Sequence, residues 1–205
     1  MQTQMVQEFS EQPTLNRQEF IQQGFQTLLQ KVMGRVETTI EPLTQRTFLR
    51  PPGAQVEALF LGLCTRCDAC TAACPHEAIS VQYGYGTPHD GTPVLLNLKE
   101  HPCLLCEDTP CISACPTEAL CAVESVSSIK IGTAVIDTLS CSAFRGSGCK
   151  VCYDVCPFPD DAIEIIEGLP FVKNDACTGC GICQHHCPED PEAITVFSTP
   201  AQNLV

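Results

Sequence analysis

The chain contains seventeen cysteines, and sixteen of them fall into four motifs that each end in Cys-Pro. Motif 4, Cys177–Pro188, reads CxxCxxCxxxCP, and motif 1, Cys64–Pro75, repeats that spelling. Motif 2, Cys103–Pro116, has two more residues before its third cysteine, and motif 3, Cys141–Pro157, has a longer first interval. The sixteen cysteines are Cys64, Cys67, Cys70, Cys74, Cys103, Cys106, Cys111, Cys115, Cys141, Cys149, Cys152, Cys156, Cys177, Cys180, Cys183 and Cys187. Three thiolates at this spacing can hold one iron–sulfur cluster, while the cysteine before proline reaches a neighbouring cluster.

Sixteen thiolates suffice for four 4Fe–4S clusters with four ligands each. Disulfides fit poorly because the cysteine count is odd and the Cys-Pro endings repeat. Zinc requires only two CxxC pairs per ion and gives no reason for triplets followed by Cys-Pro. The remaining cysteine, Cys121, is expected to be a small buried residue. His185 and His186 lie inside motif 4, but all four of its cysteines are present, so we expect these histidines at the surface rather than as ligands.

The motifs should work in pairs, and two pairings are open. Sequential pairing joins motif 1 to motif 2 and motif 3 to motif 4, whereas nested pairing joins the outer two and the inner two. The short apolar hairpin expected between Cys156 and Cys177 favours the sequential arrangement. Gly179 and Gly181 should bring backbone amides close to the sulfurs of motif 4, and acidic neighbours such as Asp68 should lower nearby reduction potentials.

The elements that position the motifs are short strands. Apolar runs bounded by turn residues predict strands at 78–81, 93–96, 129–131, 134–136, 162–166, 170–172 and 193–196. The sequence therefore predicts an α+β fold, with two tandem or nested bacterial-type ferredoxin units of two 4Fe–4S clusters each and short antiparallel strands. Residues 57–200 form the four-cluster domain in this interpretation, divided into pseudo-repeat units at 57–125 and 126–200.

An amphipathic helix is predicted ahead of this domain, at about residues 17–33. Its apolar stripe consists of Ile21, Phe25, Leu28, Leu29 and Val32. The stripe could cover the cluster domain, dock on a partner subunit or lie on a membrane surface, although its polar face is mostly glutamine. Residues 1–56 thus comprise a polar leader, this helix and an extended linker over 38–56. The sequence shows no apolar window long enough to span a membrane and no signal-peptide core, so a cytoplasmic location is expected, peripheral to a membrane if a partner carries it, with a periplasmic one as the alternative.

The formal net charge is −13, and residues 51–205 carry six basic against nineteen acidic side chains. This charge opposes binding to phosphates, and the absence of tryptophan leaves little aromatic surface for stacking on bases. We therefore do not expect the protein to bind nucleic acid. The acidity either serves solubility alone or steers the protein toward a basic face of a redox partner.

Three segments carry a narrower resemblance. Leu49–Ala54 precedes motif 1, Cys106–Cys111 lies in motif 2, and Gly148–Pro157 spans most of motif 3. Together with the four motifs, they resemble the NapG/MauM ferredoxin-type family over roughly residues 49–197. The resemblance implies an electron carrier that sits beside a membrane quinol-oxidising partner and serves a reductase or dehydrogenase system. Members usually open with a twin-arginine export signal, whereas Asn16–Phe20 has a single arginine.

The function expected from these observations is a non-catalytic electron-transfer subunit that carries four 4Fe–4S clusters between partner redox proteins, within a larger oxidoreductase or quinone-linked complex. An iron–sulfur enzyme is one alternative, but the chain has no GxGxxG or GxxxxGK[ST] segment for a nucleotide and no motif lacking a cysteine. A sensor or scaffold with a labile cluster is the other alternative.

Overall fold

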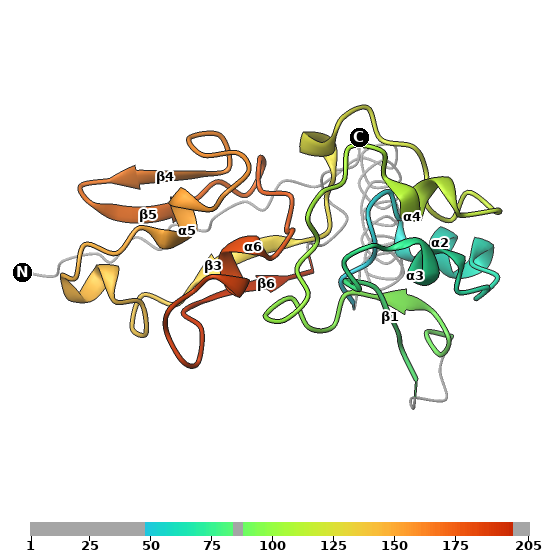
Figure 1. The fold of residues 1–205 in the computed structure, drawn as a ribbon, viewed down its shortest axis with the longest axis horizontal. Helices are drawn as coiled ribbons and strands as arrows, with labels where there is room; N and C mark the ends of the chain where they lie inside the picture. The colour runs from blue at the N-terminus through green and yellow to red at the C-terminus, as the bar shows by residue number, and fades with distance from the viewer. Residues whose placement is uncertain (1–47, 84–87, 199–205) are drawn as a thin grey trace, which may run out of the picture. The chain divides into compact units, whose positions relative to one another are not determined.

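The computed structural model describes residues 48–83 and 88–198 (Figure 1). The predicted helix at 17–33 lies outside these residues. The helices in chain order are α2 (Glu57–Leu63), α3 (Ala69–Ala73), α4 (Pro110–Ser113), α5 (Val151–Asp154) and α6 (Ile182–His185), with 3₁₀ turns at η1 (Val126–Ser128) and η2 (Ala143–Arg145). The strands are β1 (Ser80–Val81), β2 (Pro93–Val94), β3 (Thr133–Ile136), β4 (Ile163–Ile166), β5 (Leu169–Val172) and β6 (Ile194–Phe197).

The second unit, which contains motifs 3 and 4, has two antiparallel strand pairs. Strands β4 and β5 form the predicted hairpin, with Ile166 opposite Leu169. Glu167 and Gly168 make its two-residue turn with φ values of 52° and 83°, the positive sign that a type I′ turn requires at both positions. Strands β3 and β6 pair from the opposite ends of the unit and lie side by side in Figure 1. The β3–β6 pair therefore closes the unit around both of its cysteine motifs.

The first unit, which contains motifs 1 and 2, follows the same plan with shorter strands. Strands β1 and β2 pair antiparallel between the two motifs, with Ser80 opposite Val94. An isolated antiparallel bridge joins Ala54, ahead of motif 1, to Leu120, behind motif 2. This bridge occupies the place that the β3–β6 pair has in the second unit. Two short antiparallel pairings around two adjacent motifs thus occur twice, as expected for tandem ferredoxin units.

The segment that enters the first unit is buried. Arg50 is fully buried and binds the carboxylate of Glu57 through two contacts, 2.5 Å at Nη2 and 3.2 Å at Nε. Its Nη1 donates to Thr92 Oγ1 at 2.8 Å and to the Pro93 carbonyl at 3.0 Å. The guanidinium also lies over the ring of Phe60, 4.7 Å from its centroid. The stretch assigned to an extended linker therefore includes an anchor that ties α2 to β2.

The two units share one apolar core. Leu95 and Leu98 of the first unit pack in the same buried cluster as Ile131 and Val196 of the second. The predicted strand at 129–131 is absent, because Ile129 ends the η1 turn and the Ile131 amide donates to the Thr178 carbonyl at 2.8 Å. That hydrogen bond joins the connector between the units to motif 4.

Candidate iron–sulfur centres

The fold gathers the sixteen motif cysteines into four groups. In each group, the first three cysteines of one motif meet the fourth cysteine of the motif with which it is paired. Group 1 consists of Cys64, Cys67, Cys70 and Cys115, and group 2 of Cys103, Cys106, Cys111 and Cys74. Group 3 consists of Cys141, Cys149, Cys152 and Cys187, and group 4 of Cys177, Cys180, Cys183 and Cys156. This grouping is the sequential pairing, and the nested alternative is not adopted.

Groups 1, 2 and 3 each surround an open cavity, and all four cysteines of the group line it. The cavities have volumes of about 340, 400 and 350 Å³ respectively. In the described part of the chain, no three His, Cys, Asp or Glu side chains converge closely enough to bind a single metal ion. Four thiols spread around a cavity are the donor set of a 4Fe–4S cluster, so the residues present fit that group.

A short helix carries the third cysteine of every motif. Cys70 lies in α3, Cys111 in α4, Cys152 in α5 and Cys183 in α6. Each of these helices is four or five residues long, so none extends much beyond its cysteine. The first two cysteines of the motif precede the helix and the fourth follows it. One turn of helix therefore separates the first three cysteines of a motif, which belong to one group, from the fourth, which belongs to the neighbouring group.

Burial raises the pKa of several motif thiols. It raises the pKa of Cys103 to about 12 and that of Cys111 to about 11. Burial likewise raises the pKa of Cys152 to about 11 and moves the pKa of Cys183 upward. A metal ligand must be a thiolate, so cluster binding at these positions has to displace protons.

Cys115 of group 1 departs from this trend. Its burial raises the pKa, but hydrogen bonds from the amides of Thr117, Leu120 and Ala119 and from the Thr117 hydroxyl outweigh that effect and lower it. Its Sγ lies 3.9 Å from Thr117 Oγ1. At Cys70 of the same group, burial raises the pKa to about 11, while the hydroxyl and amide of Thr71 act in the opposite direction. The side chains of two threonines thus lie beside sulfurs of group 1.

The four groups form a continuous series. Cys70 of group 1 lies close enough to Cys111 of group 2 for their charges to interact. Cys103 of group 2 interacts in the same way with Cys180 of group 4, and the Cys103 amide donates to the Cys180 carbonyl at 2.9 Å. Cys183 of group 4 in turn interacts with Cys152 of group 3. The spatial order is therefore 1, 2, 4, 3, with groups 2 and 4 meeting where the units join.

The glycines of motif 4 have a packing role, and their predicted donation of amides to the cluster sulfurs stays a prediction. A Cβ atom at Gly181 would lie 2.7 Å from Leu98 Cβ, and one at Gly179 would lie 2.3 Å from the Gly132 amide nitrogen. These glycines therefore admit neighbouring segments. The donors to Cys180 are the amides of Ile182 and Cys180 and the hydroxyl of Thr178. These hydrogen bonds lower the pKa of the Cys180 thiol, but burial outweighs them and raises it.

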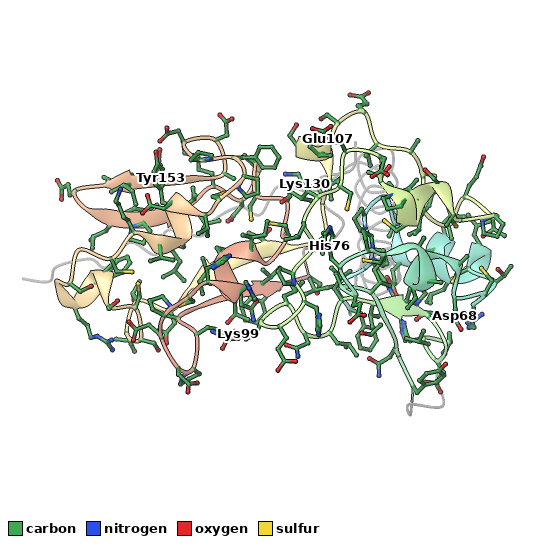
Figure 2. The ribbon with its side chains drawn as sticks, viewed as in Figure 1. Asp68, His76, Lys99, Glu107, Lys130 and Tyr153 are labelled. Carbon is green, nitrogen blue, oxygen red and sulfur yellow. The ribbon has the colours of Figure 1, made fainter. Side chains whose placement is uncertain are left out.

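Two lysines that the sequence did not single out bind the ends of motif 4. Lys99 Nζ donates to the Cys187 carbonyl at 3.2 Å, and Lys130 Nζ donates to the Cys177 carbonyl at the same distance. Both are labelled in Figure 2, near the middle of the described chain. These contacts could not be predicted from the sequence, because each lysine binds a backbone carbonyl that lies far from it in the chain.

The three residues set aside in the sequence analysis lie outside the four groups. Cys121 is half-buried and not fully buried as expected; it accepts a hydrogen bond from Gln55 Nε2 at 2.9 Å, while its thiol donates to the Glu118 carbonyl at 3.3 Å. His185 and His186 are exposed, as predicted, and the Nδ1 atom of His185 hydrogen-bonds the Lys99 carbonyl at 2.6 Å.

Comparison with protein families agrees with the two units. Residues 63–119 match the family described as a 4Fe-4S dicluster domain. Residues 140–159 and 174–190 match the family described as a 4Fe-4S binding domain. The first match covers motifs 1 and 2, and the second covers motifs 3 and 4. In the described residues, no helix has the length and apolar character needed to cross a membrane.

Several curated proteins are similar over most of the chain. The ferredoxin-type protein NapG of Escherichia coli is 39% identical over 145 residues, which are 64% of this chain and 62% of the relative. The methylamine utilization ferredoxin-type protein MauM of Methylorubrum extorquens is 40% identical over 143 residues, 64% of each chain. The matched region is thus slightly under two thirds of these relatives. MauM of Methylophilus methylotrophus is 32% identical over 174 residues, 80% of this chain and 76% of the relative. The chain belongs to the NapG/MauM ferredoxin-type family of iron–sulfur electron-transfer proteins.

Proposed function

We propose that the chain binds four 4Fe–4S clusters, one in each cysteine group, and carries single electrons between two redox partner proteins. The observation that supports this most directly is the continuous series of groups, in which Cys103 and Cys180 join the two units. When bound, such clusters supply reversible one-electron chemistry. The proposed ligands are the sixteen motif cysteines, with Cys121 outside the set.

The chain itself contributes spacing and exclusion of water. Cys177 and Cys180 are buried, and both belong to the apolar core that the two units share. Groups 1 and 3 lie at the ends of the series, and the exposed Cys67 belongs to group 1. The two end groups are therefore the places where a donor and an acceptor would approach.

The partners are proposed to be subunits of a larger oxidoreductase or quinone-linked complex that present basic faces. The supporting feature is the charge of −13, which bound clusters with four thiolates make more negative. A cytoplasmic location, peripheral to a membrane through a partner, is part of this proposal, and fractionation of cells that express the full chain tests it.

Cluster content is the first test. The holoprotein is purified without oxygen, iron and acid-labile sulfide are counted, and EPR spectra are recorded during a stepwise redox titration. We expect about sixteen irons per chain, since each of four clusters holds four. Zinc in place of iron would overturn the cluster assignment. A persistent 3Fe–4S signal, or loss of clusters in mild chelator, would favour the enzyme or the labile-cluster sensor instead.

The order of the groups is tested at Gly181. The Gly181→Ala variant pushes against Leu98 and should separate groups 2 and 4, so the magnetic interaction between reduced clusters should weaken while the iron count stays unchanged. Gly168→Ala is the matched control, because Gly168 has the same φ of 83° but nothing within 4 Å of the added Cβ. Equal EPR spectra for both variants would contradict the order 1, 2, 4, 3.

A further inference from the structure

One buried hydroxyl near group 1 makes no hydrogen bond to any of the described residues. Among the residues that the structure describes, Thr71 Oγ1 is the one buried side-chain nitrogen or oxygen without a hydrogen bond. Thr71 lies on α3 and directly follows Cys70, and its hydroxyl lowers the pKa of the Cys70 thiol although the two make no hydrogen bond of normal geometry. A buried polar group without a partner carries a free-energy cost, so the hydroxyl should have a partner in the working protein.

A second threonine approaches the same group from the other motif. Thr117 Oγ1 lies 3.9 Å from the sulfur of Cys115, and Thr117 also lines the group 1 cavity. Cys70 comes from motif 1 and Cys115 from motif 2, so the two threonines reach group 1 from independent segments. Two hydroxyls beside one set of four sulfurs are better explained by that set than by the packing of either segment.

The direction of donation follows from the chemistry of the ligands. A cysteine that binds iron is a thiolate and has no proton to donate, so the threonine hydroxyl must be the donor. Hydrogen bonds to the sulfurs of a cluster stabilise its reduced form, which carries one more negative charge, more than its oxidised form. Such bonds therefore raise the reduction potential.

We propose that Thr71 and Thr117 are tuning residues that donate hydrogen bonds to the Cys70 and Cys115 sulfurs and thereby raise the reduction potential of the group 1 cluster. This inference rests on the proposed cluster at group 1. It places two hydroxyl donors at one end of the series, on sulfurs from two different motifs.

The experiment compares valine and serine variants of the two threonines in the anaerobic holoprotein. Valine keeps the shape of threonine without the hydroxyl, and serine keeps the hydroxyl without the methyl group. Thr71→Val and Thr117→Val should each move the same single reduction step in the EPR titration to a more negative potential, and the double variant should move it further. Thr71→Ser and Thr117→Ser should leave that step near its wild-type position.

Two further variants assign the step. Cys67→Ser alters a group 1 ligand, so the step that changes with it belongs to group 1. Thr178→Val removes a hydroxyl beside Cys180 of group 4 and should shift a different step. Unchanged potentials in both valine variants, equal shifts for serine and valine, or shifts of two different steps would each overturn the proposal.

Iron counting keeps this result separate from that of the proposed function. A wild-type protein with too few irons would refute the four clusters themselves. A wild-type protein with the expected irons and unmoved valine variants would refute only the tuning role. Loss of group 1 iron in both valine variants would also overturn it, because the hydroxyls would then serve to retain the cluster.

Discussion

At the scale of single residues, the surroundings of a cysteine separate the proposed ligands from Cys121 more clearly than burial does. Cys115 and Cys121 are both half-buried and lie close together in the chain. Cys115 lines the group 1 cavity, whereas the Cys121 sulfur is held between Gln55 and the Glu118 carbonyl. The spacing of the motifs predicts that Cys115 is a ligand and Cys121 is not, and these contacts are consistent with that prediction.

Replacing these two cysteines by serine should therefore give opposite results. Cys121→Ser should keep the full iron content, since a serine hydroxyl can make both hydrogen bonds of the thiol. Cys115→Ser should lose or convert one cluster, which removes up to about four irons per chain. Anaerobic iron and sulfide counts on both variants measure this, and iron loss from Cys121→Ser would be the contradictory outcome.

At the scale of elements, local pairings were predictable and long-range ones were not. The β4–β5 hairpin was predicted because its two apolar runs flank Gly168 at a two-residue turn. The β3–β6 pair and the Ala54–Leu120 bridge join segments on either side of two motifs, and no local pattern specifies such a partner. The same reasoning explains why the predicted strand at 129–131 is absent: the Ile131 amide bonds the Thr178 carbonyl, far along the chain, and no neighbouring strand.

The sixteen candidate ligands could be proposed from spacing alone, because cysteine spacing in a tight loop encodes ligand geometry locally. The hydrogen bonds around them could not. Thr71 and Thr117 read as ordinary polar residues in the sequence, and Arg50 reads as a surface charge although it is fully buried. Their importance comes from neighbours that only the folded chain supplies.

The Arg50–Glu57 pair should stabilise the fold of the first unit by anchoring the segment that leads into it. Arg50→Met removes the guanidinium from the buried Glu57 carboxylate and leaves His89 Nδ1, 3.2 Å from Glu57 Oε1, as its neighbour. Breaking a buried pair by removing one partner costs about 3–5 kcal/mol, so a large loss of stability is expected. Arg145→Met is the control, because the Arg145–Glu189 pair is largely exposed and should contribute under about 1 kcal/mol. Anaerobic guanidinium unfolding of the holoproteins measures the two midpoints. Similar midpoints for both variants would argue against the anchor.

At the scale of the whole molecule, the net negative charge should control how partner proteins approach. The segment that carries all four motifs accounts for the entire net charge of −13. A negative surface attracts basic partners over distances that salt controls, since the screening length is about 30 Å at 10 mM and about 8 Å at 150 mM ionic strength. Long-range attraction therefore affects how fast a partner arrives more than how tightly it is held.

Electron transfer to a basic haem protein should consequently slow as salt is added. Stopped-flow mixing of the reduced holoprotein with a basic c-type cytochrome should give a second-order rate constant that falls steadily between 10 mM and 200 mM ionic strength. An acidic flavodoxin is the control and should show the reverse trend. A rate independent of salt with both probes would mean that the acidity serves solubility alone.

The closure of each unit on itself also bears on how the protein is made. The first unit has all eight of its motif cysteines by Cys115, and its closing bridge is complete at Leu120. Domains generally fold from the N-terminus during translation. The first two cysteine groups can therefore be assembled and loaded with iron while motifs 3 and 4 are still being synthesised. A nested pairing would have left motif 1 open until the last cysteine emerged from the ribosome, so sequential pairing halves the number of thiols that are exposed at one time.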